Sequence, residues 1–301
     1  MVSGVDRSGS SGDVDVKRRP PALALLTILY VMWSLVPVAI AILFSFNDGR
    51  SRTVWQGFSM RWWTGDPEQS LLHDPALRTA LRNTLVLAGG SVLVTVPLGV
   101  LLAIGLQRWR SRAATSANWL NSLPLVTPEI VMGAALLLVF THLYSGIPLG
   151  RPAQLIGHVT FSIGFVVVTV RARLVSIGPS YEEAARDLGA SRTQALRWVL
   201  LPLLTPAIMA SAVIVFATSI DDFVISSFLS SGASSETVPV RIYSAVRASS
   251  SPALNALATT MVALSFIALA VALFALSAWR HRHGDRAGLR SALGDVTQME
   301  L

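Results

Sequence analysis

The chain has 301 residues, of which 52% are hydrophobic and only 14% charged, and it contains no cysteine. A soluble domain carries about 25% charged residues, so this composition indicates a polytopic membrane protein rather than a water-soluble one. The lack of cysteine excludes disulfides, thiolate metal sites and cysteine nucleophiles. Arginine in the loops of a membrane protein accounts for the net charge of +7 without a nucleic-acid partner.

Lys17 is the single lysine of the chain, and Arg18 follows it. A Walker-A loop needs Gly-Lys-Ser/Thr in sequence, so this chain does not bind ATP in that way. If ATP drives the protein, a partner subunit binds it. We predict neither a cofactor nor a metal site in the chain itself.

Six stretches are apolar and long enough to cross a bilayer, which takes roughly 20 residues. The predicted spans are Ala22–Phe46, Thr84–Leu106, Trp119–Tyr144, Ala153–Val170, Thr205–Leu229 and Ala253–Trp279. The first could be a signal peptide, because Lys17, Arg18 and Arg19 precede it. Its apolar run exceeds the 7–15 residues of a typical signal sequence and no small-x-small site follows it, so we interpret it as a retained anchor.

The distribution of arginine predicts the orientation. With both termini in the cytoplasm, the inside segments hold 16 basic residues and the outside segments 8, as the positive-inside rule favours. We therefore predict a disordered cytoplasmic tail at 1–19, an all-α domain of six transmembrane helices at 20–279, and a second cytoplasmic tail at 280–301.

The cytoplasmic loop between the fourth and fifth spans begins with a predicted two-turn helix. Gly178-Pro179 ends the preceding helix, and Ser180 with Glu183 has the spacing of a capping box. Gly189 is suited to end the short helix in the left-handed conformation. One face of that helix is apolar, formed by Tyr181, Ala184, Ala185 and Leu188.

A second short helix is predicted directly after the first. Ser191 and Gln194 repeat the capping spacing, and Pro202 closes the segment. Its apolar stripe consists of Ala195, Leu196, Val199 and Leu200. Helices this short are marginal alone, so they need a partner surface. From the residues, a docking element for another protein and a linker lying in the lipid interface are both open.

The run Glu183-Ala184-Ala185, three residues, Gly189, nine residues and Val199-Leu200-Leu201-Pro202 resembles the EAA loop of binding-protein-dependent ABC importer permeases. Val199 replaces the isoleucine of that pattern. The resemblance implies the MetI-like fold of type I ABC importer permeases. It also implies that segment 180–202 is a coupling element for an ATPase, and the implied coupling residues are Glu183, Ala184, Ala185, Gly189, Leu201 and Pro202.

The same resemblance implies a set of partners. These are two ATP-binding cassette subunits, a sister permease and an extracytoplasmic substrate-binding protein, besides the surrounding membrane lipid. The implied location is the bacterial cytoplasmic (inner) membrane, and the implied mechanism is alternating access.

Three acidic residues lie within the predicted spans, where a charge costs about 2.5–3.5 kcal/mol. Glu129 follows Pro124 and Pro128, which predict a kinked or broken helix. Asp221 and Asp222 lie in the outer half of the fifth span, and adjacent helical positions diverge by about 100°, so at most one faces a passage squarely. No span carries a lysine or arginine for them, and a cationic substrate supplies that partner. Alternatively, Pro128-Glu129 starts a helix segment and Asp222 begins a solvated loop.

Segments 219–226, 238–244 and 251–259 resemble the spermidine/putrescine permease subfamily. The resemblance implies a linear polyamine as substrate, and a place in its passage for Ser219 and the acidic pair. Residues 58–63 resemble the entrance segment of that subfamily. There Trp62 either stacks on an ammonium group or belongs to an interfacial aromatic belt.

Other functions are weighed against this one. A permease of the same family for another small solute and an ion-coupled secondary transporter both account for buried acids, but the second leaves the EAA loop unused. An enzyme is disfavoured, because His158 stands alone in its span and Asp221 with Asp222 is an adjacent pair rather than two carboxylates on facing helices.

Overall fold

A computed structural model describes residues 21–51, 54–108, 111–248 and 252–282. The longer helices are α1 (Pro21–Phe44), α2 (Pro75–Arg108), α3 (Arg112–Val126), α4 (Glu129–Leu138), α5 (Arg151–Ile177), α8 (Leu201–Ile220), α10 (Val238–Ala248) and α11 (Ala253–Arg282). The shorter ones are α6 (Ser180–Asp187), α7 (Arg192–Ala195), α9 (Val224–Phe228) and the π-turns η1 (Arg61–Gly65), η2 (Val139–Leu143) and η3 (Leu196–Leu200). Strand pairing among the described residues is limited to a bridge between Asn47 and Phe58.

Five described helices are long and apolar enough to span a membrane, and a sixth span is formed only if a bent pair is counted as one. That pair is 112–126 with 129–143, and its two parts meet at 111°. The predicted third span, Trp119–Tyr144, is therefore divided between two helices. The break that we predicted at its prolines is present. Pro128 lacks the N–H that a continuing helix needs, and its extended backbone turns the chain before Glu129.

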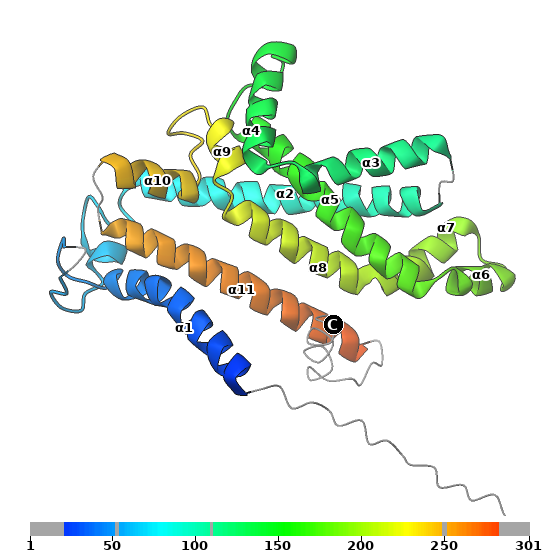
Figure 1. The fold of residues 1–301 in the computed structure, drawn as a ribbon, viewed down its shortest axis with the longest axis horizontal. Helices are drawn as coiled ribbons and strands as arrows, with labels where there is room; N and C mark the ends of the chain where they lie inside the picture. The colour runs from blue at the N-terminus through cyan, green and yellow to red at the C-terminus, as the bar shows by residue number, and fades with distance from the viewer. Residues whose placement is uncertain (1–20, 52–53, 109–110, 249–251, 283–301) are drawn as a thin grey trace, which may run out of the picture.

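The helices α2, α5 and α8 lie side by side and form the centre of the bundle (Figure 1). Their shared core is aliphatic and includes Val96, Val100, Ile104, Val166, Val170, Leu204 and Val215. The helices α11 and α1 lie along one side of this centre, whereas α3 lies along another and α4 projects away (Figure 1). The bundle explains why these spans are apolar over long runs, since several faces of each are covered by protein or lie at the membrane.

The two ends of the bundle differ in construction. One end carries the loop between α1 and α2 together with α10, and the other carries α6 and α7 (Figure 1). At the first end, Asn83 of α2 donates to the carbonyls of Ser234 and Glu236, at 2.9 and 3.0 Å, and fixes the segment before α10. The second end is the predicted two-helix loop, which we call the elbow and define as residues 178–202.

Several predicted boundaries shift. The second span begins earlier, at Pro75, because its first turns carry Arg78 and Arg82 and so escape a search for apolar runs. The last helix continues to Arg282, three residues past the predicted end of the sixth span at Trp279. The predicted tail at 1–19 and residues 283–301 lie outside the described residues, as do the basic residues of the first tail, so the proposed division into domain and tails stays a prediction.

Candidate functional site

The fifth span ends sooner than predicted, and its end creates the acidic site. Helix α8 stops at Ile220 rather than at Leu229, and Asp221 and Asp222 lie in a short break before α9. The Asp222 carboxylate accepts the backbone N–H groups of Ile225 and Ser226, at 3.3 and 2.8 Å. An aspartate that satisfies nearby N–H groups competes with the continuing helix, so it ends α8 and begins α9.

His158 of α5 completes this site and is the residue that sequence reasoning missed. It was predicted to stand alone, but its Nε2 lies 3.1 Å from Asp222 Oδ2 and 3.0 Å from Ser226 Oγ. Its Nδ1 lies 2.7 Å from Ser219 Oγ, which lies 3.4 Å from the hydroxyl oxygen of Ser91 in α2. Asp222 is thus paired with an imidazole inside the protein, and we call these five residues the Asp222 cluster.

Close packing brings α9 onto α5. A Cβ on Gly157 would lie 2.7 Å from Ile225 Cγ2 and 2.8 Å from Leu229 Cδ1, so only glycine permits this approach. One turn earlier, the Gln154 amide donates to the Ser226 carbonyl at 2.9 Å. The polar contacts of Gln154 and His158 therefore lie on one buried face of α5, directly against the break.

The three predicted acidic residues end in different surroundings. Glu129 begins α4, and its carboxyl group lies close enough to those of Asp222 and Asp221 for the three groups to interact electrostatically. Asp222 is buried, whereas Asp221 is exposed and lines a cavity of about 430 Å³ between α8 and α11. The remaining walls of that cavity are nearly all apolar. The predicted divergence of the two aspartates is present, and two helix breaks bring three carboxyl groups into one region.

Trp62 belongs to a packing cluster that contains none of these carboxyl groups. It is fully buried in a cluster with the start of α2 and of α11, and its indole N–H donates to the Asn47 carbonyl at 2.6 Å. The Arg61 guanidinium lies 5.0 Å from the ring centre and pairs with Asp66 at 3.1 Å. The ring is therefore neither open to a solute in this conformation nor part of an exposed aromatic belt.

Asp66 holds the same loop in place. The backbone N–H groups of Gln69 and Glu68 donate to its carboxylate at 3.0 and 3.1 Å, and Arg61 lies beside it. These contacts hold the pKa of Asp66 below its usual value. The loop between α1 and α2 is thus fixed locally by backbone capping as much as by its tryptophans.

In the elbow, Gly189 ends α6 as predicted. Its φ is +91°, its N–H donates to the Arg186 carbonyl at 2.9 Å, and Ala190 donates to the Ala185 carbonyl at 3.0 Å. This pair of bonds is a Schellman motif, which turns the chain sharply toward α7. The capping box of Ser191 and Gln194 is also present, with bonds of 3.3 and 2.8 Å.

Two local predictions for the elbow are wrong. Ser180 does not cap α6, because Pro179 is the cap residue and its carbonyl already accepts the N–H groups of Glu182 and Glu183. Pro202 does not close the segment, since α7, η3 and α8 form one continuous helix over 192–220. In η3 the Leu201 N–H bonds to the Leu196 carbonyl, and this widened turn accommodates a proline that has no N–H.

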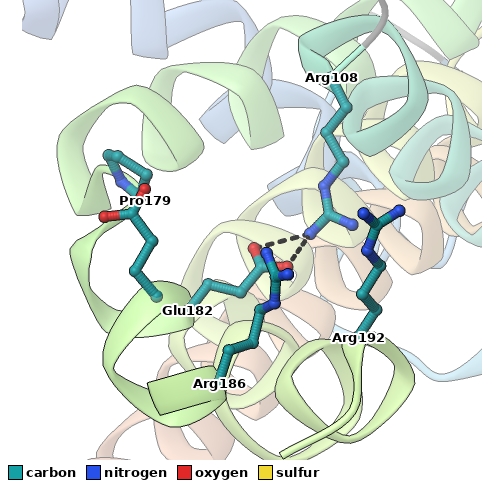
Figure 2. Close-up of a pocket in the computed structure, with 6 residues that line it drawn as sticks. Arg108, Pro179, Glu182, Arg186 and Arg192 are labelled. Carbon is teal, nitrogen blue, oxygen red and sulfur yellow. Dashed lines mark hydrogen bonds and ion pairs between the residues drawn. The ribbon is translucent and has the colours of Figure 1, made fainter.

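The outer face of α6 has no cover within the described chain. Tyr181 is 56% exposed and Leu188 90% exposed, and no residue of this helix is buried. On another face, Glu182 receives two bonds from the Arg108 guanidinium at the end of α2, at 2.6 and 2.7 Å (Figure 2). Arg186 and Arg192 lie beside this pair around a pocket of about 270 Å³ (Figure 2).

Comparison with known proteins identifies the family. The model of the family described as "Binding-protein-dependent transport system inner membrane component" matches residues 95–283. The chain belongs to this family. The chain is accordingly a multi-pass permease of the inner membrane, with a transport role. The matched range includes the elbow and both helix breaks, so the predicted resemblance is confirmed at family level.

Two curated permeases are similar over most of their length. The "Spermidine/putrescine transport system permease protein PotC" of Escherichia coli K12 is 38% identical over 242 residues, covering 80% of this chain and 88% of that protein. The "Putrescine transport system permease protein PotI" of the same strain is 34% identical over 251 residues, with coverages of 81% and 86%.

Solved structures agree on the fold. A bacterial ABC transporter for import of the acidic polysaccharide alginate superposes with a TM-score of 0.66 at 19% identity, over 87% of this chain and 94% of that one. The MetNI methionine ABC transporter in an inward-facing conformation gives 0.56 at 19% identity, over 67% and 93%. The predicted all-α fold of ABC importer permeases is confirmed.

Proposed function

We propose that this chain is the permease subunit of an ATP-driven importer for linear polyamines such as putrescine and spermidine. The observation that carries the proposal is the meeting of Glu129, Asp221 and Asp222 at two helix breaks. Carboxylates in a region of low dielectric need a cationic partner or a proton, and an alkyl diamine supplies the cation. The names of the two curated relatives support the same class of solute.

The three carboxyl groups have different roles in this proposal. Asp222 is committed to His158 and to the start of α9, so it shapes the site more than it offers free oxygens. Asp221 is the exposed member, beside an apolar cavity that suits a methylene chain. Glu129 lies at the other break, between α3 and α4. We therefore assign the ammonium contacts to Asp221 and Glu129. Ser219 supports the site through His158, and Trp62 supports the loop between α1 and α2, at the end of the bundle opposite the elbow.

The elbow serves as the coupling element. The exposed apolar face of α6 and its sharp end at Gly189 support docking against a partner, and the contact of Glu182 with Arg108 links α6 to α2. In this proposal two ATP-binding subunits hydrolyse ATP, a sister permease completes the passage, and an extracytoplasmic receptor delivers the solute. The termini and the elbow are cytoplasmic. Glu183, Ala184, Ala185, Leu201 and Pro202 belong to the coupling segment.

The test is uptake of radiolabelled putrescine and spermidine by the full complex in liposomes that contain ATP. We expect uptake that depends on ATP and on the ATPase subunits. Uptake of a different solute alone would contradict the polyamine assignment. Polyamine uptake by the isolated permease along an ion gradient would instead favour the secondary transporter.

The Asp221→Asn variant tests the assigned ammonium contact. A hydrogen bond to a charged group contributes about 1.5–3 kcal/mol, so uptake per ATP hydrolysed falls roughly 10- to 100-fold, while assembly is retained. Asp48→Asn is the matched control, because Asp48 is exposed in the loop between α1 and α2. Equal uptake by wild type and Asp221→Asn would remove this residue from the passage.

A further inference from the structure

His158 is a fully enclosed polar residue whose contacts reach three segments. Its side chain is 2% exposed, and it touches Ser219 at the end of α8, Asp222 in the break and Ser226 of α9. Through Ser219 the contacts continue to Ser91 of α2. A buried polar group that loses its partner is destabilising, so each of these segments is held to α5 by hydrogen bonds that are costly to break.

The hydrogen-bond partners of His158 indicate which ring nitrogen carries a hydrogen. An ionised aspartate only accepts hydrogen bonds, so the Nε2 of His158 carries the hydrogen that it donates to Asp222 Oδ2. Oδ2 also receives the Ser226 N–H, and Oδ1 receives the Ile225 N–H. His158 thus holds the Asp222 carboxylate from the side of α5, while two backbone N–H groups of the following turn hold it from the other side.

We infer that His158 is the positioning residue of the proposed substrate site. It touches no part of the passage cavity. By holding Asp222 against α5, it directs the preceding residue, Asp221, to the opposite side, where Asp221 lines the cavity between α8 and α11. It also fixes the carboxyl group with which that of Glu129 interacts. This inference rests on the proposed function, because it assigns the geometry of that same site.

The experiment compares His158→Ala with Gln154→Ala in the reconstituted complex. Gln154 is the matched control, because it is equally buried one turn away and bonds to backbone carbonyls of Ser226 and Ser235 but not to Asp222. The readout is the number of polyamine molecules imported per ATP hydrolysed. We expect His158→Ala to lower that number at least tenfold and Gln154→Ala to leave it within twofold, whatever either does to abundance in the membrane.

Two substitutions with amide side chains distinguish the contribution of Nε2 from that of Nδ1. His158→Gln places an amide donor near the position of Nε2 and should restore most of the import per ATP. His158→Asn reaches only the position of Nδ1, toward Ser219, and should behave like His158→Ala. This comparison also decides the matter if His158→Ala does not accumulate. Restoration by Asn and not by Gln would overturn the inference.

A double variant tests whether His158 acts through Asp222. In an Asp222→Asn background, removal of His158 should cost less than twofold more, because coupled residues are not additive. Additive losses would overturn the inference, as would unchanged import per ATP in His158→Ala. A wild-type complex that carries no polyamine refutes the proposed function before any variant is measured, so the two failures are distinguishable.

Discussion

The Asp222 cluster and the elbow differ in how their polar and apolar side chains are covered. The cluster is enclosed, and its members satisfy one another across α2, α5, α8 and α9 with bonds of 2.7–3.4 Å. The elbow is exposed, its one described ion pair is half open to solvent, and the apolar face of α6 lacks any cover from the described chain. The comparison teaches that the first region is complete within one chain, whereas the second has an apolar face that the described chain leaves open and that the proposed function assigns to a partner subunit.

The largest expected effect is at the end of α6. Gly189→Leu forces a side chain into a backbone with φ of +91°, which costs about 1–3 kcal/mol and opens the turn between α6 and α7. Uptake should fall to background while insertion is retained, since nothing in the bundle lies within 4 Å of a Cβ there. Gly189→Asn is the control, because asparagine tolerates this conformation. Normal uptake with leucine would contradict a docking role for the elbow.

The next effect separates the two regions directly. Leu188→Ser changes a side chain that is 90% exposed, so the thermal stability of the purified permease should not change. Its co-purification with the ATPase subunits should fall about tenfold or more, because a buried leucine contributes about 1.5–3 kcal/mol to an interface. Unaltered co-purification, or a destabilised permease, would show that this face is covered in some other way.

Substitutions of two adjacent serines test how much the Asp222 cluster contributes to stability. Ser226→Ala removes the hydroxyl that lies 3.0 Å from His158, and we expect a loss of about 1 kcal/mol in the free energy of unfolding. Ser227→Ala is the control, since that hydroxyl bonds only to the Val224 carbonyl of its own turn. Thermal denaturation in detergent checks both, and equal shifts would mean that the cluster contributes no special stability.

The smallest effect concerns the ion pair of the elbow. Arg108→Ala should change stability by less than about 1 kcal/mol, because the two side chains are 44% and 22% exposed and solvent screens them. Each single reversal, Arg108→Glu or Glu182→Arg, should lower the uptake per ATP hydrolysed. The double variant, which exchanges the two charges, should restore it. If the double variant is as poor as the worse single variant, the pair does not link α6 to α2.

Much of this fold was predictable because its signals are local. Apolar runs gave the spans, and a spacing of three residues gave the capping box of Ser191 and Gln194. Long-range pairs were not predictable. The Arg108 contact with Glu182 joins residues 74 positions apart, and the contact of His158 with Ser226 joins residues 68 apart.

One signal for the cluster was nevertheless in the sequence. Gln154, His158 and Ser162 follow one another at four-residue spacing in an apolar span, and all three are buried on one face of α5. In a membrane helix such a polar stripe faces protein rather than lipid. His158 was therefore predictable as an inward residue, although its partner was not, because the early end of α8 depends on the Asp222 side chain itself.

The uninterrupted helix over 192–220 has a geometric consequence. Its 29 residues form a rod about 43 Å long, with the elbow at one tip and the break before Asp221 at the other. A rigid tilt of about 4° around one tip displaces the far tip by about 3 Å, the length of one hydrogen bond. In the proposed coupling, a tilt of this size at the elbow moves the break far enough to separate the Asp222 carboxylate from the His158 imidazole, which lie 3.1 Å apart.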